Sequence, residues 1–223
     1  MADSYSETRS QLETYFDRTA SKTWERLTSD APVSRIRETV RAGRDEMRSM
    51  LLGSLPEDLR GARVLDAGCG AGQMSCELAV RGAEVIGVDI SPSLLGVAMA
   101  RTPEDLAGRI TYLAGDMLDP IHGEVDFVVA MDSLIHYQPP DAAAALSQLA
   151  ERTADKVVFT IAPKTPMLTA MHLAGKLFPR ADRSPAIVPT AVKSLDRELA
   201  RNLTTLGRVN TAFYKSQAME LAA

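Results

Sequence analysis

The chain has 223 residues, of which 45% are hydrophobic, and it carries 25 basic and 29 acidic residues for a net charge of −4. This length suits one α/β domain with additions, and the hydrophobic share is enough for one large core. The slightly acidic balance argues against nucleic acid as a partner. No apolar stretch approaches the roughly 20 residues that cross a bilayer.

The first residues, MADSYSETRSQLE, are polar and do not match a signal peptide. Cys69 and Cys76 fit neither a disulfide framework nor a zinc pattern, so reduced, buried thiols and no protein-bound metal are expected. These features predict a cytoplasmic protein.

Residues 1–60 are predicted to be a helical cover in front of the core. YFDRTASKTWERL places Tyr15, Phe16 and Trp24 close together, although the chain has only 11 aromatic residues. In the following VSRIRETVRAGRDEMRSMLL, apolar residues recur at helical spacing, so one face can dock on the core. We interpret the five arginines of this stretch as a solvated face.

Residues 61–162 alternate apolar runs of strand length with helical stretches, which predicts a Rossmann-like, doubly wound α/β sheet. The near-continuous apolar runs suit parallel strands buried on both faces. Strands are expected at 62–65, 84–88, 110–113, 125–130 and 156–161. Helices are expected at 73–81, 93–101 and 141–153. Ligands of such sheets bind at the carboxyl ends of the strands.

Residues 163–192 are predicted to be an insert after the fifth strand. Spaced prolines surround MLTAMHLAGKLF, which indicates a helix with a loop. This insert would hang over the strand ends, where a lid belongs. Residues 193–223 are expected to complete the core with a helix and closing strands.

The stretch VLDAGCGAGQMS begins in the first predicted strand and continues into a turn, where Gly68, Gly70 and Gly72 are spaced unlike the dinucleotide fingerprint. Asp66 closes the strand beside this turn, where it would repel a pyrophosphate but attract a cation. S-adenosyl-L-methionine has no phosphate and carries a sulfonium and an α-amino group. We therefore predict this methyl donor as the cofactor, with Cys69 lining its site as a small side chain that fits the tight turn.

Acidic residues also end the next two strands. Asp89 lies close to the roughly 20-residue offset at which an acid meets ribose hydroxyls, and Ile90 can flank the adenine. Asp116 is suited to accept a hydrogen bond from the adenine amino group, and Met117 can donate one from its backbone. The alternative is that Asp89 and Asp116 are helix caps or turn residues.

The segment DSLIHYQPPD follows the fourth strand and is predicted to face the methyl acceptor. Asp132 is expected at the cofactor and Tyr137 at the substrate. His136 would be a base or a hydrogen-bond partner of the acceptor, unless it is a loop residue bonded to backbone. Tyr15, from the N-terminal cover, could close over the cofactor or the acceptor.

Over residues 60–162 the chain resembles the class I S-adenosylmethionine-dependent methyltransferases. This resemblance implies a seven-stranded sheet with six parallel strands and one reversed strand. The tail GRVNTAFYKSQAMEL is consistent with the closing antiparallel pair, although the first strand of that pair looks short.

Outside the core the chain resembles the magnesium-protoporphyrin IX O-methyltransferases of chlorophyll and bacteriochlorophyll synthesis. The resemblance rests on YFDRTASKTWERL, RETVRAGRDEMR, DSLIHYQPPD, VVFTIAPKTPML and FYKSQAMEL. That family esterifies one propionate of a magnesium porphyrin, so magnesium arrives in the substrate. The resemblance also implies the porphyrin-binding subunit of magnesium chelatase as a partner and a peripheral place at the photosynthetic membrane.

The insert offers one wall for such a macrocycle. Met167 and Met171 are expected to contact it, the alternative being that they pack into the core. Lys164, Lys176 and Arg180 could meet the second propionate. Two other functions stay open: methyl transfer to oxygen or nitrogen of another small metabolite, such as a quinone precursor, and non-catalytic regulation by a cofactor-binding protein.

Overall fold

The fold is known from a computed structural model that describes residues 2–17, 34–166, 168–169, 186–199 and 201–223. Seven strands form one sheet in the order β3-β2-β1-β4-β5-β7-β6. The strands are β1 (Arg63–Ala67), β2 (Glu84–Asp89), β3 (Ile110–Ala114), β4 (Val125–Ala130), β5 (Thr153–Ile161), β6 (Leu203–Asn210) and β7 (Lys215–Ala222). Neighbours from β3 to β5 pair in parallel, and β7 is antiparallel to β5 and β6. The predicted doubly wound sheet is confirmed.

Both faces of the central strands are buried, which explains their apolar runs. Leu65 and Val128 pack into the core on one face of the sheet, whereas Val64, Phe127 and Val129 pack into the core on the other. Successive side chains of a strand point to opposite faces, so the central strands are mostly apolar, with Asp66 in β1 and Asp126 in β4 among the exceptions.

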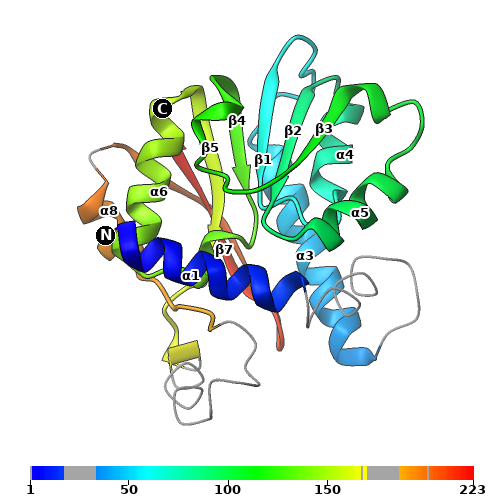
Figure 1. Ribbon diagram of the computed structural model, residues 1–223. Helices are drawn as coiled ribbons and strands as arrows, with labels where there is room; N and C mark the ends of the chain where they lie inside the picture. Colours follow the sequence, from blue (N-terminus) through cyan, green and yellow to red (C-terminus); the bar gives the residue numbers. More distant parts are fainter. Residues whose placement is uncertain (1, 18–33, 167, 170–185, 200) are drawn as a thin grey trace.

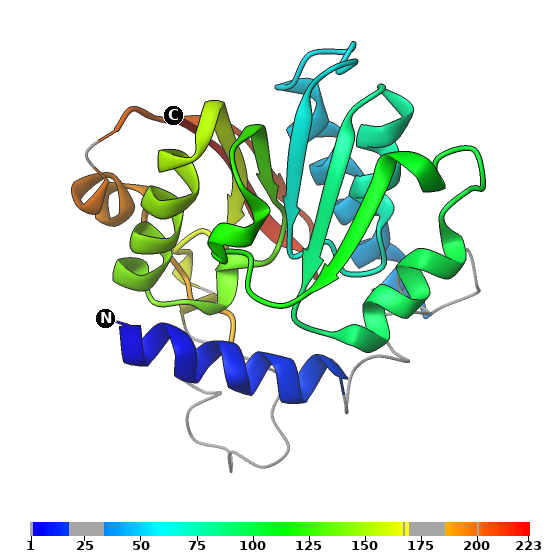
Figure 2. The same cartoon turned by 45° about the horizontal axis from the view of Figure 1, so that its top comes forward.

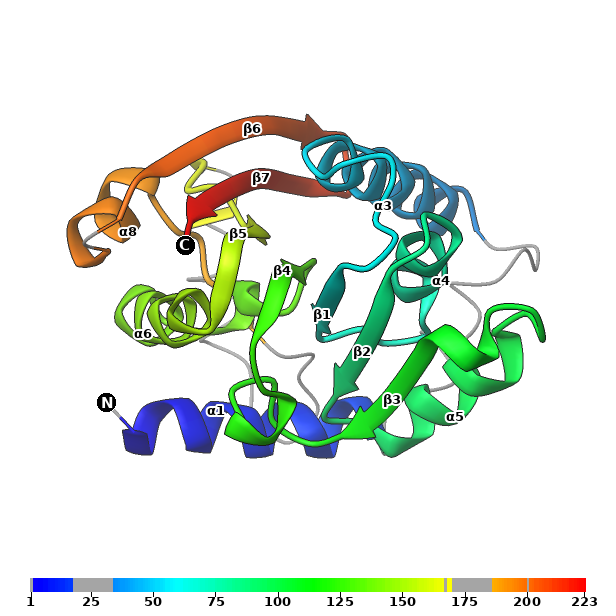
Figure 3. The same cartoon turned by 90° about the horizontal axis from the view of Figure 1, so that it is seen from above.

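The helices on the two faces leave the carboxyl ends of the strands accessible. Helices α3 (Arg35–Gly53), α4 (Gln73–Val80) and α5 (Pro92–Arg101) lie along one face, and α6 (Pro139–Glu151) and α8 (Val192–Glu198) along the other (Figure 3). Serine caps begin two of them: Ser34 accepts from the Arg37 backbone N–H and Ser91 from that of Leu94. The strand order reverses between β1 and β4, the place where such sheets bind ligands.

Helix α1 (Ala2–Tyr15) runs across the carboxyl ends of the strands (Figures 1 and 2). Leu12 is buried in the core, and the Ser4 hydroxyl donates to the Asp141 carboxylate at 2.8 Å. Helix α3 behaves differently, because Met47 and Leu51 are fully buried against the sheet. Within residues 2–17 and 34–60, one helix therefore lies over the strand ends and one helix packs into the core.

The interpretation of the α3 arginines as a solvated face was wrong for two of the five. Arg44 forms an ion pair with Asp132, and Arg48 pairs with Asp45 and Glu77, so both side chains are mostly buried. Their partners Asp132 and Glu77 lie far along the chain, which the helical pattern of this stretch does not reveal.

The closing strands also differ from the prediction in one respect. Strand β6 has eight residues, as long as β7, rather than being short. A register shift between Thr205 and Gly207 interrupts its alternation, and Met50 of α3 packs so closely that a Cβ at Gly207 would lie 2.6 Å from its Sδ. The glycine and the irregularity hid the strand pattern.

The described ends of the insert are tied to the core. Pro163 and Thr190 form a parallel bridge, and the Thr190 N–H donates to the Ala162 carbonyl at 2.8 Å. The Val188 N–H donates to the Ile135 carbonyl, also at 2.8 Å, so residues 186–190 lie beside the loop after β4. Several predicted positions lie outside the described residues: Trp24, Met167, Met171, Lys176 and Arg180.

No helix in the described ranges combines the length and the apolar character that crossing a membrane requires.

Candidate active site

A cavity of about 300 Å³ opens at the carboxyl ends of the central strands, beside α1. Most residues that the sequence singled out line it, although they come from four strand ends and from α1. These are Tyr15, Asp66, Gly68, Cys69, Gly70, Asp89, Ile90, Asp116, Met117, Asp132, His136 and Tyr137. Two described candidates, Gly72 and Lys164, do not line it. The fold thus brings the predicted site residues together.

The glycine loop between β1 and α4 packs closely against the loop after β4. Gly68 has φ +88, and a Cβ on it would lie 2.5 Å from the Ser133 Cβ. The N–H groups of Gly68 and Cys69 both donate to the Val88 carbonyl, at 2.8 and 3.0 Å. Only a glycine permits this backbone conformation together with this approach.

Gly70 and Gly72 have different surroundings. A Cβ on Gly70, which has φ +54, would meet no protein atom within 4 Å, and the residue lines the cavity. A Cβ on Gly72 would lie 2.5 Å from the Tyr112 hydroxyl and 2.9 Å from the Ala98 Cβ. Packing at the start of α4 thus accounts for Gly72, and the predicted cofactor contact at this residue does not match its position.

Two carboxyl groups flank the loop: that of Asp66, which is buried, and that of Asp89, which is partly buried. The Ser75 hydroxyl donates to Asp66 at 2.6 Å, and burial raises the pKa of Asp66 to about 7. The Asp89 carboxylate accepts from the N–H groups of Gly70 at 2.8 Å and Ser91 at 2.9 Å, while burial raises its pKa. Asp89 therefore stabilises the backbone of the loop and also lines the cavity. The alternative role, that of a turn residue, thus describes part of what Asp89 does.

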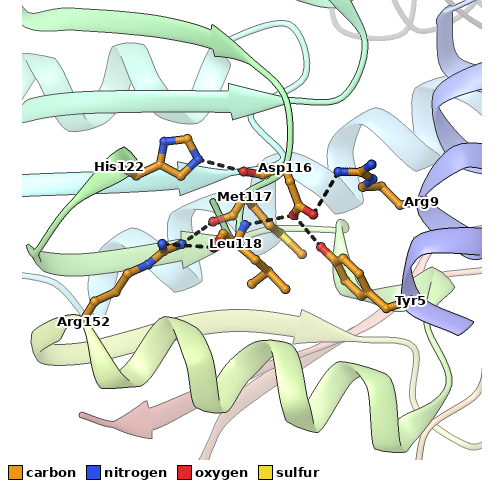
Figure 4. A network of polar contacts seen from close by, with 7 residues as sticks. All are labelled: Tyr5, Arg9, Asp116, Met117, Leu118, His122 and Arg152. Atoms are coloured by element: carbon orange, nitrogen blue, oxygen red, sulfur yellow. Dashed lines mark hydrogen bonds and ion pairs between the residues drawn. The ribbon is translucent and has the colours of Figure 1, made fainter. Parts of the chain in front are cut away.

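Asp116 connects β3 to α1 (Figure 4). Its Oδ1 accepts from the Tyr5 hydroxyl at 2.8 Å and from the Leu118 N–H at 2.9 Å, and its Oδ2 accepts from Arg9 at 3.0 Å. The sequence did not indicate Tyr5 or Arg9, because their role depends on where α1 lies.

Side chains of His122 and Arg152 form hydrogen bonds with the backbone carbonyls of the loop that begins at Asp116 (Figure 4). The His122 Nε2 donates to the Asp116 carbonyl at 2.7 Å. Arg152 donates to the carbonyls of Met117 and Leu118, and to that of Asp119 at 2.7 Å. These bonds fix the loop that presents Asp116 and Met117 to the cavity.

Asp132, just after β4, has φ +56, the one described non-glycine residue with a positive φ. Its side chain forms an ion pair with Arg44 and accepts from the Tyr214 hydroxyl at 3.0 and 3.1 Å. Its N–H donates to the Thr160 hydroxyl at 2.7 Å. A left-handed residue costs of order 1–3 kcal/mol, and this network compensates that strain.

Tyr15 and His136 approach the same place from α1 and from the loop after β4. Both rings contact Phe16: Tyr15 at a centroid distance of 5.3 Å and His136 at 5.9 Å, each edge to face. The His136 Nδ1 donates to the Ala186 carbonyl at 3.2 Å, which leaves Nε2 with a lone pair. Burial lowers the pKa of His136, so the ring is neutral at pH 7.

Tyr137 is nearly fully buried, and its ring stacks on Tyr5 at 4.7 Å and 17°. Burial raises the pKa of Tyr137 to about 12. Tyr137 therefore packs on α1 and also lines the cavity. No group of three or more His, Cys, Asp or Glu in the described part of the chain could hold a metal ion.

The strand order and the glycine loop between acidic strand ends define a class I methyltransferase. A general methyltransferase-domain model matches residues 64–156. The fold is shared with the N-methyltransferase NodS of Bradyrhizobium japonicum, at a TM-score of 0.60 and 19% identity over 90% of this chain and 96% of that one.

The chain belongs to the magnesium-protoporphyrin O-methyltransferases. The family model described as magnesium-protoporphyrin IX methyltransferase C-terminus matches residues 130–223. The magnesium-protoporphyrin O-methyltransferase of Rhodobacter capsulatus is 50% identical over 99% of both chains. The crystal structure of magnesium protoporphyrin IX methyltransferase from Synechocystis with bound SAH has a TM-score of 0.79 and 31% identity, and it covers 95% of this chain and 97% of that one.

Relatives that act in quinone synthesis match less of the chain. A ubiquinone biosynthesis O-methyltransferase of Xanthomonas oryzae is 31% identical over 55% of this chain. The comparisons therefore support the porphyrin methyltransferases over the alternative, a methyltransferase of a quinone precursor.

Proposed function

We propose that the cavity binds S-adenosylmethionine and that the enzyme transfers its methyl group to a propionate carboxylate of magnesium protoporphyrin IX. Family membership supports the overall reaction. The observation that carries the assignment of the site is the gathering of three acidic strand ends and an open glycine loop around one cavity. We assign Asp89 and Ile90 to the ribose and adenine, Asp116 and Met117 to the adenine edge, and Gly68 and Gly70 to the methionine part.

One orphaned polar atom supports this orientation of the ligand. The Ser133 Oγ is buried, has no hydrogen-bond partner among the described residues, and lines the cavity next to Gly68. Buried hydroxyl groups are normally hydrogen-bonded. The amine or the carboxylate of the methionine part would form the missing hydrogen bond with this hydroxyl. Arg44 and Asp132 line the same cavity and carry charges opposite to those of the carboxylate and the amine.

The charge of the site also suits a cation. Burial raises the pKa of Asp66, and the nearby charge of Asp89 raises it further. A bound cation would relieve the cost of keeping both groups ionised. A pyrophosphate would increase that cost.

We assign His136 the role of a base for the acceptor. A propionic acid has a pKa near 4.3 in water, but burial beside a macrocycle raises it, so the bound acid retains its proton more readily. Because Nδ1–H is used by Ala186, the neutral ring presents only the Nε2 lone pair, which accepts a proton and cannot donate to a carboxylate.

In the assigned reaction, Nε2 of His136 takes the carboxyl proton, and the freed oxygen forms a bond to the methyl carbon. The cofactor supplies that methyl on a positive sulfur, which leaves as a neutral thioether. Tyr15 shares the Phe16 contact with His136 and is assigned to align the two reactants.

The test is an assay with S-adenosylmethionine that carries a trideuteromethyl group. Incubated with the enzyme and magnesium protoporphyrin, it should give the labelled monomethyl ester, detected by mass. Heat-denatured enzyme is the control. Absence of the ester with folded protein contradicts the proposal, and a dimethyl ester as the main product contradicts the choice of one propionate.

We also assign two expectations about substrate delivery. The first is a contact with the porphyrin-binding subunit of magnesium chelatase, and the second is a peripheral place at the photosynthetic membrane, on its cytoplasmic side. The apolar character of the macrocycle supports both, since it favours transfer between surfaces over release to water. Co-sedimentation of the protein with lipid vesicles, and pull-down with the purified subunit, test them separately.

A further inference from the structure

The cavity has an apolar mouth. The structure describes six large hydrophobic side chains as exposed, and two of them, Phe213 at 57% and Ile187 at 44%, line this cavity. Exposed apolar side chains that gather at one place mark a binding surface more than scattered ones do. The other four, Ile36, Val80, Met99 and Ile121, do not line it.

Both residues lie in the part of the chain that distinguishes this family. Phe213 and Ile187 fall within residues 130–223, which the magnesium-protoporphyrin methyltransferase model matches. They lie outside residues 64–156, which the general methyltransferase model matches. The mouth is therefore built by the segment that is specific to porphyrin methyltransferases, whereas the general segment provides most of the strand ends around the cavity.

The backbone holds Phe213 in place through its neighbour Tyr214. The Thr211 hydroxyl accepts from the Tyr214 N–H at 3.0 Å, which closes the turn between β6 and β7. Tyr214 points inward, and its hydroxyl donates to Asp132. Its ring packs so tightly on α3 that a Cβ at Gly43 would lie 2.7 Å from it. A fixed inward Tyr214 leaves the adjacent Phe213 at the mouth.

Ile187 is fixed in a similar way from both sides. The Ala186 carbonyl accepts from His136, and the Val188 N–H donates to the Ile135 carbonyl. The residues on both sides of Ile187 are therefore bonded to the loop that carries His136. Tyr214, next to Phe213, is bonded to Asp132 of the same loop. The two apolar residues keep a set position relative to the assigned base.

We propose that Phe213 and Ile187 contact the porphyrin macrocycle and so determine the acceptor specificity of the enzyme. An aromatic ring and a branched aliphatic side chain suit a flat, apolar macrocycle, because both offer apolar area at a small cost in conformational entropy. The proposal rests on the proposed function. The proposed function does not say which residues select a large planar acceptor, and we assign that selection to Phe213 and Ile187 rather than to the residues on the cofactor side of the cavity.

The experiment compares Phe213→Ala with Phe213→Trp and with Met99→Ala. Met99 is 55% exposed, close to the value for Phe213, but it lies on α5 away from the cavity. Titration of the Soret band with magnesium protoporphyrin gives the porphyrin affinity, calorimetry gives the cofactor affinity, and steady-state assays give kcat and KM.

Phe213→Ala should weaken porphyrin binding roughly tenfold, with unchanged cofactor affinity, because it removes an aromatic contact and apolar area. Phe213→Trp should retain affinity, and Met99→Ala should match the wild type. Ile187→Ala should raise KM for the porphyrin with a smaller effect on kcat.

The outcomes separate this proposal from the proposed function. If the wild type neither binds nor methylates magnesium protoporphyrin, the proposed function fails. If the wild type does both and Phe213→Ala has wild-type porphyrin affinity, the proposed function stands and this inference is overturned. A loss of cofactor affinity equal to the loss of porphyrin affinity would also overturn it, since a general distortion of the cavity would then explain both.

Discussion

The Tyr5 hydroxyl donates a 2.8 Å hydrogen bond to the carboxylate of Asp116, and it thereby fastens α1 to the end of β3 (Figure 4). An ionised carboxylate has about four acceptor positions. Tyr5, Arg9 and the Leu118 N–H use three of them. The described residues therefore leave one position for the adenine amino group, so the same side chain would hold both the covering helix and the cofactor.

Tyr5→Phe should loosen α1 and weaken cofactor binding. The variant keeps the stack on Tyr137 but loses a hydrogen bond to a charged group, which contributes about 1.5–3 kcal/mol. We expect faster hydrogen exchange of α1 and an affinity for S-adenosylmethionine that falls by up to roughly tenfold. Glu7→Gln, an exposed change on the same helix, is the control. Unchanged exchange in Tyr5→Phe would mean that the hydrogen bond does not hold the helix.

The sequence predicts the sheet and the strand ends well because their signals are local. A strand buried on both faces is mostly apolar, and the run predicted at 125–130 is the observed β4, in which Asp126 is the one charged residue. The glycine loop and the acids beside it are likewise read within one strand–turn–helix unit. Asp66, Asp89 and Asp116 meet at one cavity because parallel strands share an edge.

The rest of the site depends on contacts between distant segments. Arg44 meets Asp132 across 88 residues, Tyr5 meets Asp116 across 111, and Tyr214 meets Asp132 across 82. No spacing rule connects such pairs, so Arg44 was interpreted as solvated and Tyr5 was missed. Gly43 gave a signal that was not used: a glycine inside a helix often marks the close approach of a neighbour, here Tyr214.

Ser133→Ala should weaken the cofactor complex without destabilising the free protein. The Ser133 hydroxyl has no partner among the described residues, so the free protein loses no hydrogen bond. If the cofactor satisfies this hydroxyl, the variant loses about 0.5–1.5 kcal/mol of binding free energy. Calorimetry measures the affinity, and thermal unfolding of the free protein measures the stability. A lower Tm with unchanged affinity would indicate that the hydroxyl has a structural partner instead.

Alanine at Gly70 and at Gly72 should have different effects. Both residues have positive φ, so each change costs about 1–2 kcal/mol of backbone strain. Gly72→Ala adds a steric conflict with Tyr112 and Ala98, and we expect the larger loss of Tm there. Gly70→Ala places its methyl group in the cavity, and Gly70→Val fills more of it, so cofactor affinity should fall in that order. Normal binding by Gly70→Val would show that the loop does not contact the cofactor.

The raised pKa of Asp66 predicts a pH dependence with a definite sign. Burial raises the pKa from 3.8 to about 7, so the folded protein binds this proton more tightly than the unfolded chain does. The free energy of unfolding should therefore fall as the pH rises from about 4 to about 7, and this contribution should be constant above. Affinity for the cationic cofactor should instead rise through pH 7, as the carboxylate forms.

Asp66→Asn should remove the pH dependence of stability and that of cofactor affinity. Above pH 7 its free energy of unfolding should exceed that of the wild type, because no buried carboxylate forms. Ser75→Ala is the matched second variant, because the Ser75 hydrogen bond works against the raised pKa of Asp66. In Ser75→Ala the midpoint of the rise in cofactor affinity should move to higher pH. Affinities measured by calorimetry between pH 6 and 8 test this. A wild-type profile in Asp66→Asn would place the titration on another group.

His136→Ala and Tyr15→Phe should lower turnover while cofactor affinity stays nearly intact, since each acts on the reacting pair. Loss of a base costs about 10²–10⁴-fold in kcat, whereas loss of an aligning contact at Tyr15 should cost roughly tenfold. The lowered pKa of His136 keeps the base neutral, so the acidic limb of the wild-type pH profile should lie below pH 6.5. In His136→Ala the limb set by the imidazole should be replaced by one set by the bound propionic acid, so raising the pH should partly restore the activity of the variant. His136→Ala with an unchanged acidic limb, and with folding confirmed by circular dichroism, would show that the ring only connects its loop to Ala186. Activity would then come from the alignment of the two reactants alone.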